Sequence, residues 1–311
     1  MAFLYALPGA VAEGLIWGLM AIGVYISYKI LDIADLTVDG SICTGACVCA
    51  VLLGLGLPAW VCVLAALLAG ALTGMVTGLL HTRLGIPSIL AGILTQLMLY
   101  SVNLLILSGK SLVPVDPRAN NLLVHMSNNP RSILVMAIVV TATIFVLYEF
   151  FYTQIGLTLK SAGDNPDMSR AQGVDVDRNK VLGLAIANGI VAMAGAMLAQ
   201  YKGSANINDG RGAIVIALAA IFIGLSVSLK IKPNFVVSLI GVVSGGIVYY
   251  SVYNFVILLG LKTDYLKMLS AIIVALFLGV PYLKSKYFTK QRDLRPSQII
   301  EQSRKGGNGD A

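Results

Sequence analysis

The sequence has few charged side chains. Of its 311 residues, 12% are Asp, Glu, Lys or Arg and 57% are hydrophobic. Because a soluble domain carries about 25% charged residues, this chain lacks the polar groups to cover a surface in water. The net charge of +7 does not indicate nucleic acid, since most basic residues lie beside hydrophobic runs. Composition therefore excludes most soluble enzymes and nucleic-acid-binding modules, and it indicates a polytopic membrane protein.

Residues that bind metals are equally scarce. The two histidines, His81 and His125, have no cysteine or carboxylate partners at ligand spacing. We therefore expect neither a metal site nor a catalytic residue. The cysteine spacing matches no zinc or redox motif, and all four cysteines are expected to pack between helices: Cys43, Cys47, Cys49 and Cys62.

A nucleotide-binding motif is also missing. Gly109-Lys110-Ser111 is similar to the end of a P-loop, but the upstream glycine that such a loop requires would fall on Leu104. The chain is therefore not expected to hydrolyse nucleotides or to hold a cofactor itself.

Long hydrophobic runs are the main positive feature. A spanning helix needs about 20 mostly apolar residues, and the first run continues past the length of a signal peptide. Strand-type alternation is absent. The sequence predicts an all-α membrane bundle of about nine spans, or eight or ten if one segment is broken or forms a hairpin. The nine runs are 10–28, 40–57, 59–80, 87–108, 132–152, 181–200, 213–229, 234–258 and 267–287.

Basic residues in the connections indicate the orientation, because Lys and Arg concentrate in cytoplasmic loops. The 153–180 loop carries four of them, and the stretch from Lys284 to the C-terminus carries seven. Placing both stretches inside puts the N-terminus outside and the C-terminus in the cytoplasm. We predict a transmembrane domain over residues 1–287 and a disordered cytoplasmic tail over 288–311.

Glycines repeat at helical spacing in two runs. Gly70-x-x-x-Gly74-x-x-x-Gly78 and Gly14-x-x-x-Gly18 each place glycines on one helix face. Such faces allow a neighbouring helix to approach closely. Both patterns therefore predict helix packing rather than a functional site.

Three aspartates separate the first two runs. Asp32, Asp35 and Asp39 lie there with Thr37 and Ser41. Ionisable groups at membrane depth are costly and tend to line a water-filled path, and broken helices expose backbone groups to a substrate. This pattern makes Asp35, Thr37, Asp39 and Ser41 candidates for a translocation pathway, with Ser41 as the cap of the next helix. An ordinary cytoplasmic turn with solvated aspartates remains the alternative.

The fourth run carries a polar face. Gln96, Tyr100 and Asn103 follow i, i+4, i+7 spacing, with Thr95 beside them. The face predicts either part of the same pathway or hydrogen bonding between helices.

The 153–180 loop contains signals for a short helix. Asn165-Pro166 indicates a helix start with proline at the first position, Asp167 suits the helix dipole, and Gly173 is a stop signal. A helix of about two turns that presents Met168 and Val174 would suit a groove in a soluble partner. A surface loop without a partner is the alternative.

The same loop resembles a family signature. Gly163-Asp-Asn165-Pro166-x-x-x-Arg170-Ala-x-Gly173 is similar to the coupling helix of ABC-importer permeases of the branched-chain amino-acid and ribose type. Parts of residues 14–46 and 192–226 resemble the same family, in the same order. The motif Leu-Thr-Val-Asp-Gly-Ser at 36–41 resembles uncharacterised permeases of tryptophan/tyrosine-type importers, and branched-chain permeases differ there. The resemblance implies that the ATPase-coupling residues are Gly163, Asn165, Pro166, Arg170 and Gly173.

This resemblance implies the permease subunit of a bacterial ABC importer in the inner membrane. The expected partners are a second permease copy, a cytoplasmic ATPase that holds ATP and Mg, and an extracytoplasmic binding protein or lipoprotein. An aromatic or other amino acid is the expected substrate, with a nucleoside or sugar as the alternative. A self-sufficient secondary transporter or channel is the competing class, and a membrane-embedded enzyme is a third. A secondary transporter would need buried ion-coupling carboxylates in the later spans, and a membrane-embedded enzyme would need a catalytic set at membrane depth. The sequence shows neither feature.

Overall fold

The computed structural model confirms the all-α prediction. It describes residues 2–115, 122–126, 129–228 and 234–258, together with residues 268, 271, 272, 275 and 279. Six of the described helices are long and apolar enough to cross a membrane, and two apolar helices are shorter, Val38–Gly54 and Ala213–Ser226. The predicted run 267–287 lies largely outside the described residues, and the tail 288–311 lies wholly outside them. The count of nine spans stays a prediction.

Eight predicted runs coincide with observed helices. The start and end of most differ by a few residues, which reflects fraying and capping at the ends. The first helix is longer than predicted, because it begins at Ala2 and continues through a π-helical turn at Ile26–Ile30. The helices are α1 Ala2–Tyr25, α2 Val38–Gly54, α3 Ala59–Thr82, α4 Ser88–Ile106, α5 Asn129–Tyr152, α6 Gln154–Asp164, α7 Pro166–Ala171, α8 Val176–Lys202, α9 Ala213–Ser228 and α10 Phe235–Leu258.

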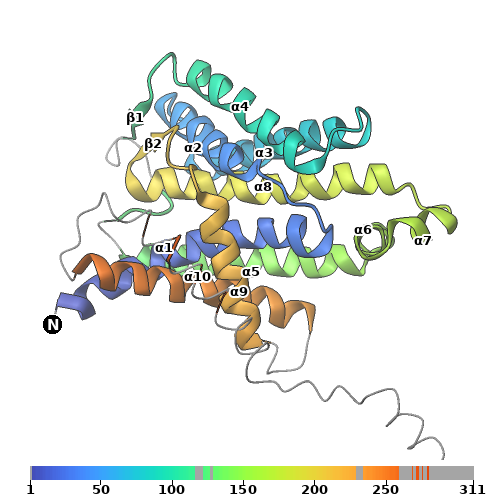
Figure 1. Cartoon of the computed structure of the whole chain (residues 1–311). Coiled ribbons are helices and arrows are strands. Elements are labelled where there is room, and N and C mark those ends of the chain that lie inside the picture. The colour runs from blue at the N-terminus through green and yellow to red at the C-terminus, as the bar shows by residue number, and fades with distance from the viewer. Residues whose placement is uncertain are drawn as a thin grey trace, which may run out of the picture. The chain divides into compact units, whose positions relative to one another are not determined.

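The helix α8 lies at the centre of the unit formed by Met1–Val274. It packs against α3, α2 and α1, while α10 packs against α1 and α9. Figure 1 shows most long helices running in a common direction, with α9 crossing them. One small departure from the prediction is a pair of antiparallel strands, β1 Leu112–Pro114 and β2 Ser204–Asn206.

The glycine patterns are packing surfaces, as predicted. A Cβ atom on Gly74 would collide with the carbonyl oxygen of Leu184 and lie 2.9 Å from the Cα of Ala185, both in α8. A Cβ atom on Gly14 would lie 2.7 Å from the Cα of Ile247 in α10. Helix backbones therefore touch at these positions, which only glycine permits.

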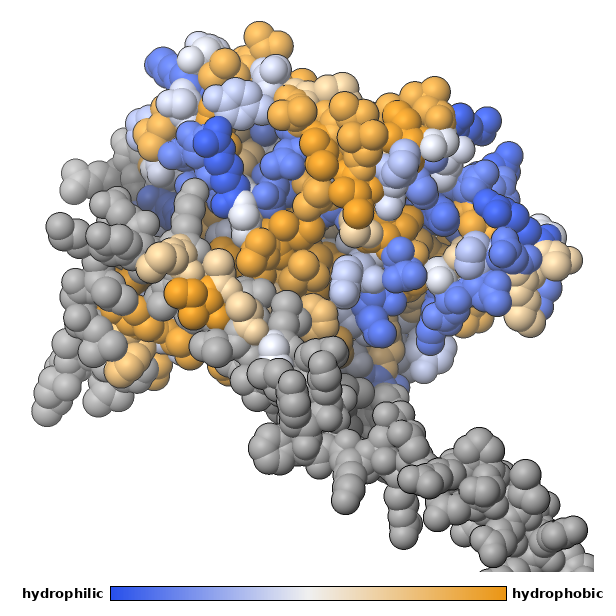
Figure 2. All heavy atoms as spheres, in the orientation of Figure 1, coloured by the Kyte–Doolittle hydropathy of each residue, from blue (hydrophilic) through white to orange (hydrophobic). Residues whose placement is uncertain are grey.

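The surface of the bundle carries a wide apolar band. Figure 2 shows hydrophobic residues across the middle of the face, with hydrophilic residues gathered toward the end that carries α6 and α7. Along α3, large apolar side chains point outward, which suits contact with lipid tails: Trp60, Leu64, Leu68, Leu72, Met75, Val76 and Leu79. All four cysteines are free and buried, in agreement with their predicted packing role.

Candidate functional site

The chain breaks its helix between α1 and α2. The π-helical turn ends at Ile30, and Asp32 has a positive φ of 54°, a conformation that Asp tolerates better than most residues. An irregular stretch follows up to Thr37, and α2 begins at Val38. The capping role predicted for Ser41 is therefore wrong, because Ser41 lies inside the first turn of α2. Its side chain is instead turned into the bundle.

Asp35 anchors this irregular stretch to the centre of the bundle. It is 2% exposed, unlike the exposed Asp32, so a turn with solvated aspartates does not describe it. One carboxylate oxygen accepts from the backbone N–H of Thr37 at 2.9 Å, and the other accepts from Nδ2 of Asn188 at 2.6 Å. The hydroxyl of Ser41 donates to Oδ1 of Asn188 at 2.7 Å. The side chains of Asp35, Asn188 and Ser41 thus join the irregular stretch to α8 and α2.

Threonines extend this network into α3 and α4. The Thr37 and Thr77 hydroxyls lie 2.7 Å apart, and Thr77 donates to Thr95 at 3.0 Å. The hydroxyls of Ser41 and Thr73 also lie 2.7 Å apart. Buried polar groups need such partners, because an unmade hydrogen bond costs about 1–3 kcal/mol. Sequence analysis missed Thr73, Thr77 and Asn188; the i, i+4 spacing of the two threonines was the available signal.

Asp39 holds the start of α9. Its two carboxylate oxygens accept from the backbone N–H groups of Gly212 at 2.9 Å and Ile214 at 2.8 Å. These are donors that a helix N-terminus leaves unpaired. A side chain from α2 therefore caps α9 across 173 and 175 positions of sequence.

Replacing Asp39 by alanine should consequently destabilise the fold. The two N–H groups would lose their acceptors, at a cost of about 1–2 kcal/mol. The thermal unfolding midpoint of the detergent-purified chain should fall. Asp39→Asn, which keeps one acceptor oxygen, should restore about half of that loss. An unchanged midpoint for Asp39→Ala would contradict the capping role.

A cavity gathers several predicted pathway residues. It has a volume of about 400 Å³ and lies between α2, α4 and the segment before α9. Its walls include Asp39, Gln96, Tyr100, Asn103 and Arg211. The side chain of Asn103 is 1% exposed, and its Oδ1 has no hydrogen-bond partner among the described residues. An unpaired buried acceptor on a cavity wall suits a ligand that donates a hydrogen bond.

The predicted pathway residues therefore fall into two groups. Asp39, Gln96, Tyr100 and Asn103 line this cavity. Asp35, Thr37 and Ser41 lie outside its lining, in the buried hydrogen-bond network, where their polar atoms are satisfied by the protein. Thr95 belongs to the same network.

The loop after α5 contains two helices where one short helix was predicted. In α6, which the sequence analysis missed, Thr153 caps the N-terminus by accepting from the N–H of Gly156. In α7, Asn165 accepts from the N–H of Met168 at 3.0 Å, and Pro166 is the first helical residue. Gly173 follows with a φ of 80°, which ends the turn. The predicted helix start and stop of α7 are confirmed.

The residues of this loop differ in what they touch. Arg170 is exposed and pairs with Asp177 at 3.3 Å and Asp167 at 3.8 Å, so it ties α7 to the first turn of α8. Gly163 faces inward, since a Cβ atom there would collide with the carbonyl oxygen of Ile30. The side chain of Met168 is 60% exposed. The loop thus has an outer face on α7 and an inner face at the end of the first helix.

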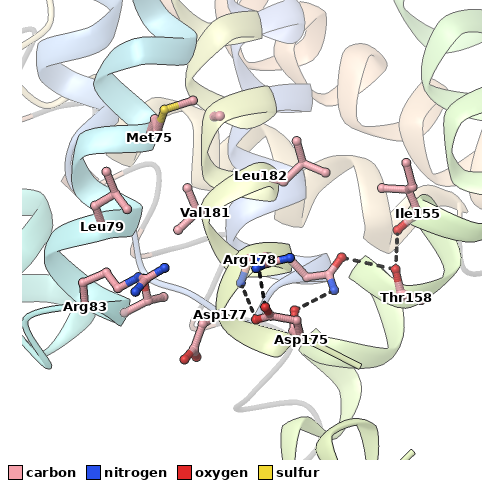
Figure 3. A pocket seen from close by; sticks show the side chains of 13 residues that line it. Met75, Leu79, Arg83, Ile155, Thr158, Asp175, Asp177, Arg178, Val181 and Leu182 are labelled. Carbon is pink, nitrogen blue, oxygen red and sulfur yellow. Dashed lines mark hydrogen bonds and ion pairs between the residues drawn. The ribbon is translucent and has the colours of Figure 1, made fainter. Parts of the chain in front are cut away.

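A pocket of about 870 Å³ lies beside this loop between α3, α6 and α8. Figure 3 shows aliphatic side chains on one part of its wall and charged side chains on the other. Arg178 pairs with Asp175 at 2.8 Å, and Thr158 donates to Asn179 at 3.2 Å. The pocket therefore marks where the apolar part of the bundle meets the polar loop.

A helical bundle with an apolar surface, a broken helix after its first span and a polar cavity beside α2 and α4 defines a multi-pass membrane transport protein. Residues 9–278 match the family model described as the branched-chain amino acid transport system permease component. The chain belongs to this family and is the permease component of an ABC transport system. Family membership implies an ATPase and a binding protein as its partners.

Several curated proteins are similar to the chain. The tyrosine transport system permease protein of Clostridioides difficile (strain R20291) is 37% identical over 268 residues, which cover 86% of this chain and 88% of that protein. The uncharacterized protein RP368 of Rickettsia prowazekii is 33% identical, with coverage of 73% and 79%. The ribose import permease protein RbsC of Escherichia coli K12 is 25% identical, with coverage of 78% and 75%. No solved structure matches the chain significantly.

Proposed function

We propose that this chain carries an aromatic amino acid through the bacterial inner membrane, with ATP hydrolysed by a separate subunit. The observation that carries the substrate class is the likeness to a tyrosine transport permease over most of both chains. The cavity of Asp39, Gln96, Tyr100, Asn103 and Arg211 supports it, because it offers charges of both signs and amide groups to a small zwitterion. A nucleoside or sugar is the second candidate, favoured by the more distant ribose permease.

The proposed path of coupling starts at α7. Its exposed face, with Met168 and Arg170, docks on the ATPase. Gly163 in α6 packs directly on Ile30, and Gly183 in α8 packs on the side chain of Leu31. These contacts meet the irregular stretch that leads to Asp35. A shift of α6 and α7 would therefore move the base of that stretch, and rigid packing transmits such shifts.

The assembly proposed here has two permease copies and two ATPases, and a binding protein or lipoprotein delivers substrate from outside. The loop with α6 and α7 faces the cytoplasm, because basic residues favour that side. The N-terminus then lies outside and the C-terminus inside. The chain itself holds no cofactor, and ATP and Mg bind to the partner.

Reversing the charge of Arg170 tests the coupling role. Arg170→Glu would face Asp167 and Asp177 with a third negative charge and break both ion pairs. We expect normal expression and folding of the chain but at least about tenfold slower ATP-driven tyrosine uptake, a change equivalent to about 1.4 kcal/mol. The measurement is uptake into proteoliposomes that contain the co-purified complex.

Arg83→Glu is the matched control, because Arg83 is exposed at the end of α3. It should leave uptake near the wild-type rate. Wild-type uptake by Arg170→Glu would disprove the coupling assignment. Uptake by the wild-type chain alone, without ATP, would overturn the importer and favour a secondary carrier.

A further inference from the structure

A second cavity lies on the other side of the segment before α9. It has a volume of about 430 Å³, and it is lined by residues of α1, α8, α9, α10 and the 208–212 segment together with Ala271. None of the pathway residues expected from the sequence contributes to it. Arg211 lines both this cavity and the one that holds Asn103, so the two cavities adjoin at one side chain.

One wall of the second cavity is aromatic. Trp17 and Tyr250 stack with ring centroids 5.6 Å apart and an interplanar angle of 21°, and Tyr253 lies 5.5 Å from Tyr250. Trp17 and Tyr250 are 5% and 6% exposed, so packing fixes their positions. Rings held in this way offer a rigid surface to another aromatic ring, and such ring pairs gain free energy beyond simple burial.

Another part of the lining is ionic. Lys202 and Asp209 form an ion pair at 3.6 Å, and both side chains are partly exposed. Arg211 forms no ion pair with any residue that the structure describes. The lining of the cavity therefore contains two cations and one carboxylate. Because Asp209 pairs with Lys202, Arg211 is the lining cation that remains to hold a substrate carboxylate. Asp209 is the available acceptor for an ammonium group.

We propose that this cavity is a binding site for a free aromatic amino acid, with its ring on Trp17 and Tyr250 and its carboxylate on Arg211. The proposal rests on the proposed function and adds the site that selects the substrate class. Arg211 then passes the carboxylate to the neighbouring cavity, where the unpaired Oδ1 of Asn103 accepts a hydrogen bond from the ammonium group. A neutral nucleoside or sugar would leave Arg211 without a partner.

Trp17 makes the site directly testable in the full chain. The protein has two tryptophans, and the other, Trp60, is 60% exposed on α3. In a Trp60→Phe background the emission of Trp17 reports on this cavity alone. Titration with L-phenylalanine should give a saturable change in that emission. Phenethylamine, which lacks the carboxylate, and L-leucine, which lacks the ring, should each bind at least about tenfold more weakly.

Arg211→Gln should weaken phenylalanine binding by about tenfold or more, since a charge-assisted hydrogen bond is lost. Arg83→Gln, an exposed arginine at the end of α3, should bind as the wild type does. Size-exclusion profiles show whether each variant is folded. The proposed site is overturned if Trp17 emission does not change during the titration, or if Arg211→Gln binds L-phenylalanine as tightly as the wild type. If the complex takes up tyrosine with ATP but Trp17 emission does not change, the site is refuted and the proposed function is retained. If phenylalanine binds but the complex shows no uptake, only the proposed function is refuted.

Discussion

Gly74→Ala should disrupt the packing of α3 on α8. The added methyl group would collide with the carbonyl oxygen of Leu184, and the backbone of α8 cannot move aside as a flexible side chain can. A displacement of α3 would also strain the hydrogen bond that joins Thr73 in α3 to Ser41 in α2. We expect a loss of about 3 kcal/mol or more, at the upper end of the cost of overpacking. Most of the purified protein should then aggregate during size-exclusion chromatography in detergent.

Gly54→Ala is the matched control for this result. Gly54 is the last residue of α2, and a Cβ atom there would meet no other atom within 4 Å. Both substitutions gain up to about 1 kcal/mol of helix propensity, so their difference isolates the contact. Gly54→Ala should be neutral or slightly stabilising. Equal thermal midpoints for the two variants would show that the helices do not touch at Gly74.

Asp35→Asn should impair transport more than any other conservative change in the network. The carboxylate accepts from the backbone N–H of Thr37 at 2.9 Å and from Nδ2 of Asn188 at 2.6 Å, and an amide keeps only one acceptor oxygen. If that oxygen stays with Thr37, the new NH2 group faces the Nδ2 donor of Asn188. Correcting this by turning the Asn188 amide would sacrifice its bond to the carbonyl oxygen of Leu184 at 3.1 Å. The loss of a hydrogen bond to a charged group is about 1.5–3 kcal/mol. We expect tyrosine uptake to fall by at least about tenfold.

The exposed neighbour Asp32 provides the control. Asp32→Asn makes the same chemical change in water, and asparagine accepts the positive φ of 54° at this position. It should leave uptake and thermal midpoint unchanged. The double variant Asp35→Asn with Asn188→Asp exchanges donor and acceptor, and partial recovery of uptake would identify the pair itself. If the Asp35→Asn single variant takes up tyrosine at the wild-type rate, the buried hydrogen-bond network has no role in transport.

The helices were predictable because the bilayer demands long apolar runs. The runs 59–80 and 213–229, for example, differ from α3 and α9 by at most two residues at either end. The short helix α7 was equally predictable, since Asn165, Pro166 and Gly173 are local signals whose effect does not depend on distant contacts. The longer α6 was missed because its buried residues Gly156, Leu159 and Ala162 lie in a polar stretch that reads as loop.

The site was predictable only in part. Asp39, Gln96 and Asn103 are polar residues in apolar surroundings, and the cavity they share brings them together. Asn188 shows no such signal, because one amide in a 27-residue helix has no local pattern. Its partners Ser41 and Asp35 lie 147 and 153 positions away. Trp17 and Tyr250 were unrecognisable as a binding surface, since single aromatic residues in apolar spans are ordinary core residues.

The burial of the four cysteines has a practical consequence for accessibility mapping. Each cysteine is 3% exposed or less, and none forms a disulfide. Water-soluble maleimides therefore have no ready target on the native chain, because a buried thiol reacts poorly. A cysteine introduced at a loop position, such as Asn208, would then be the principal labelled residue. The native protein can therefore be used without removing its own cysteines. Labelling of an introduced cysteine by a maleimide that does not cross the membrane then reports the side on which that position lies.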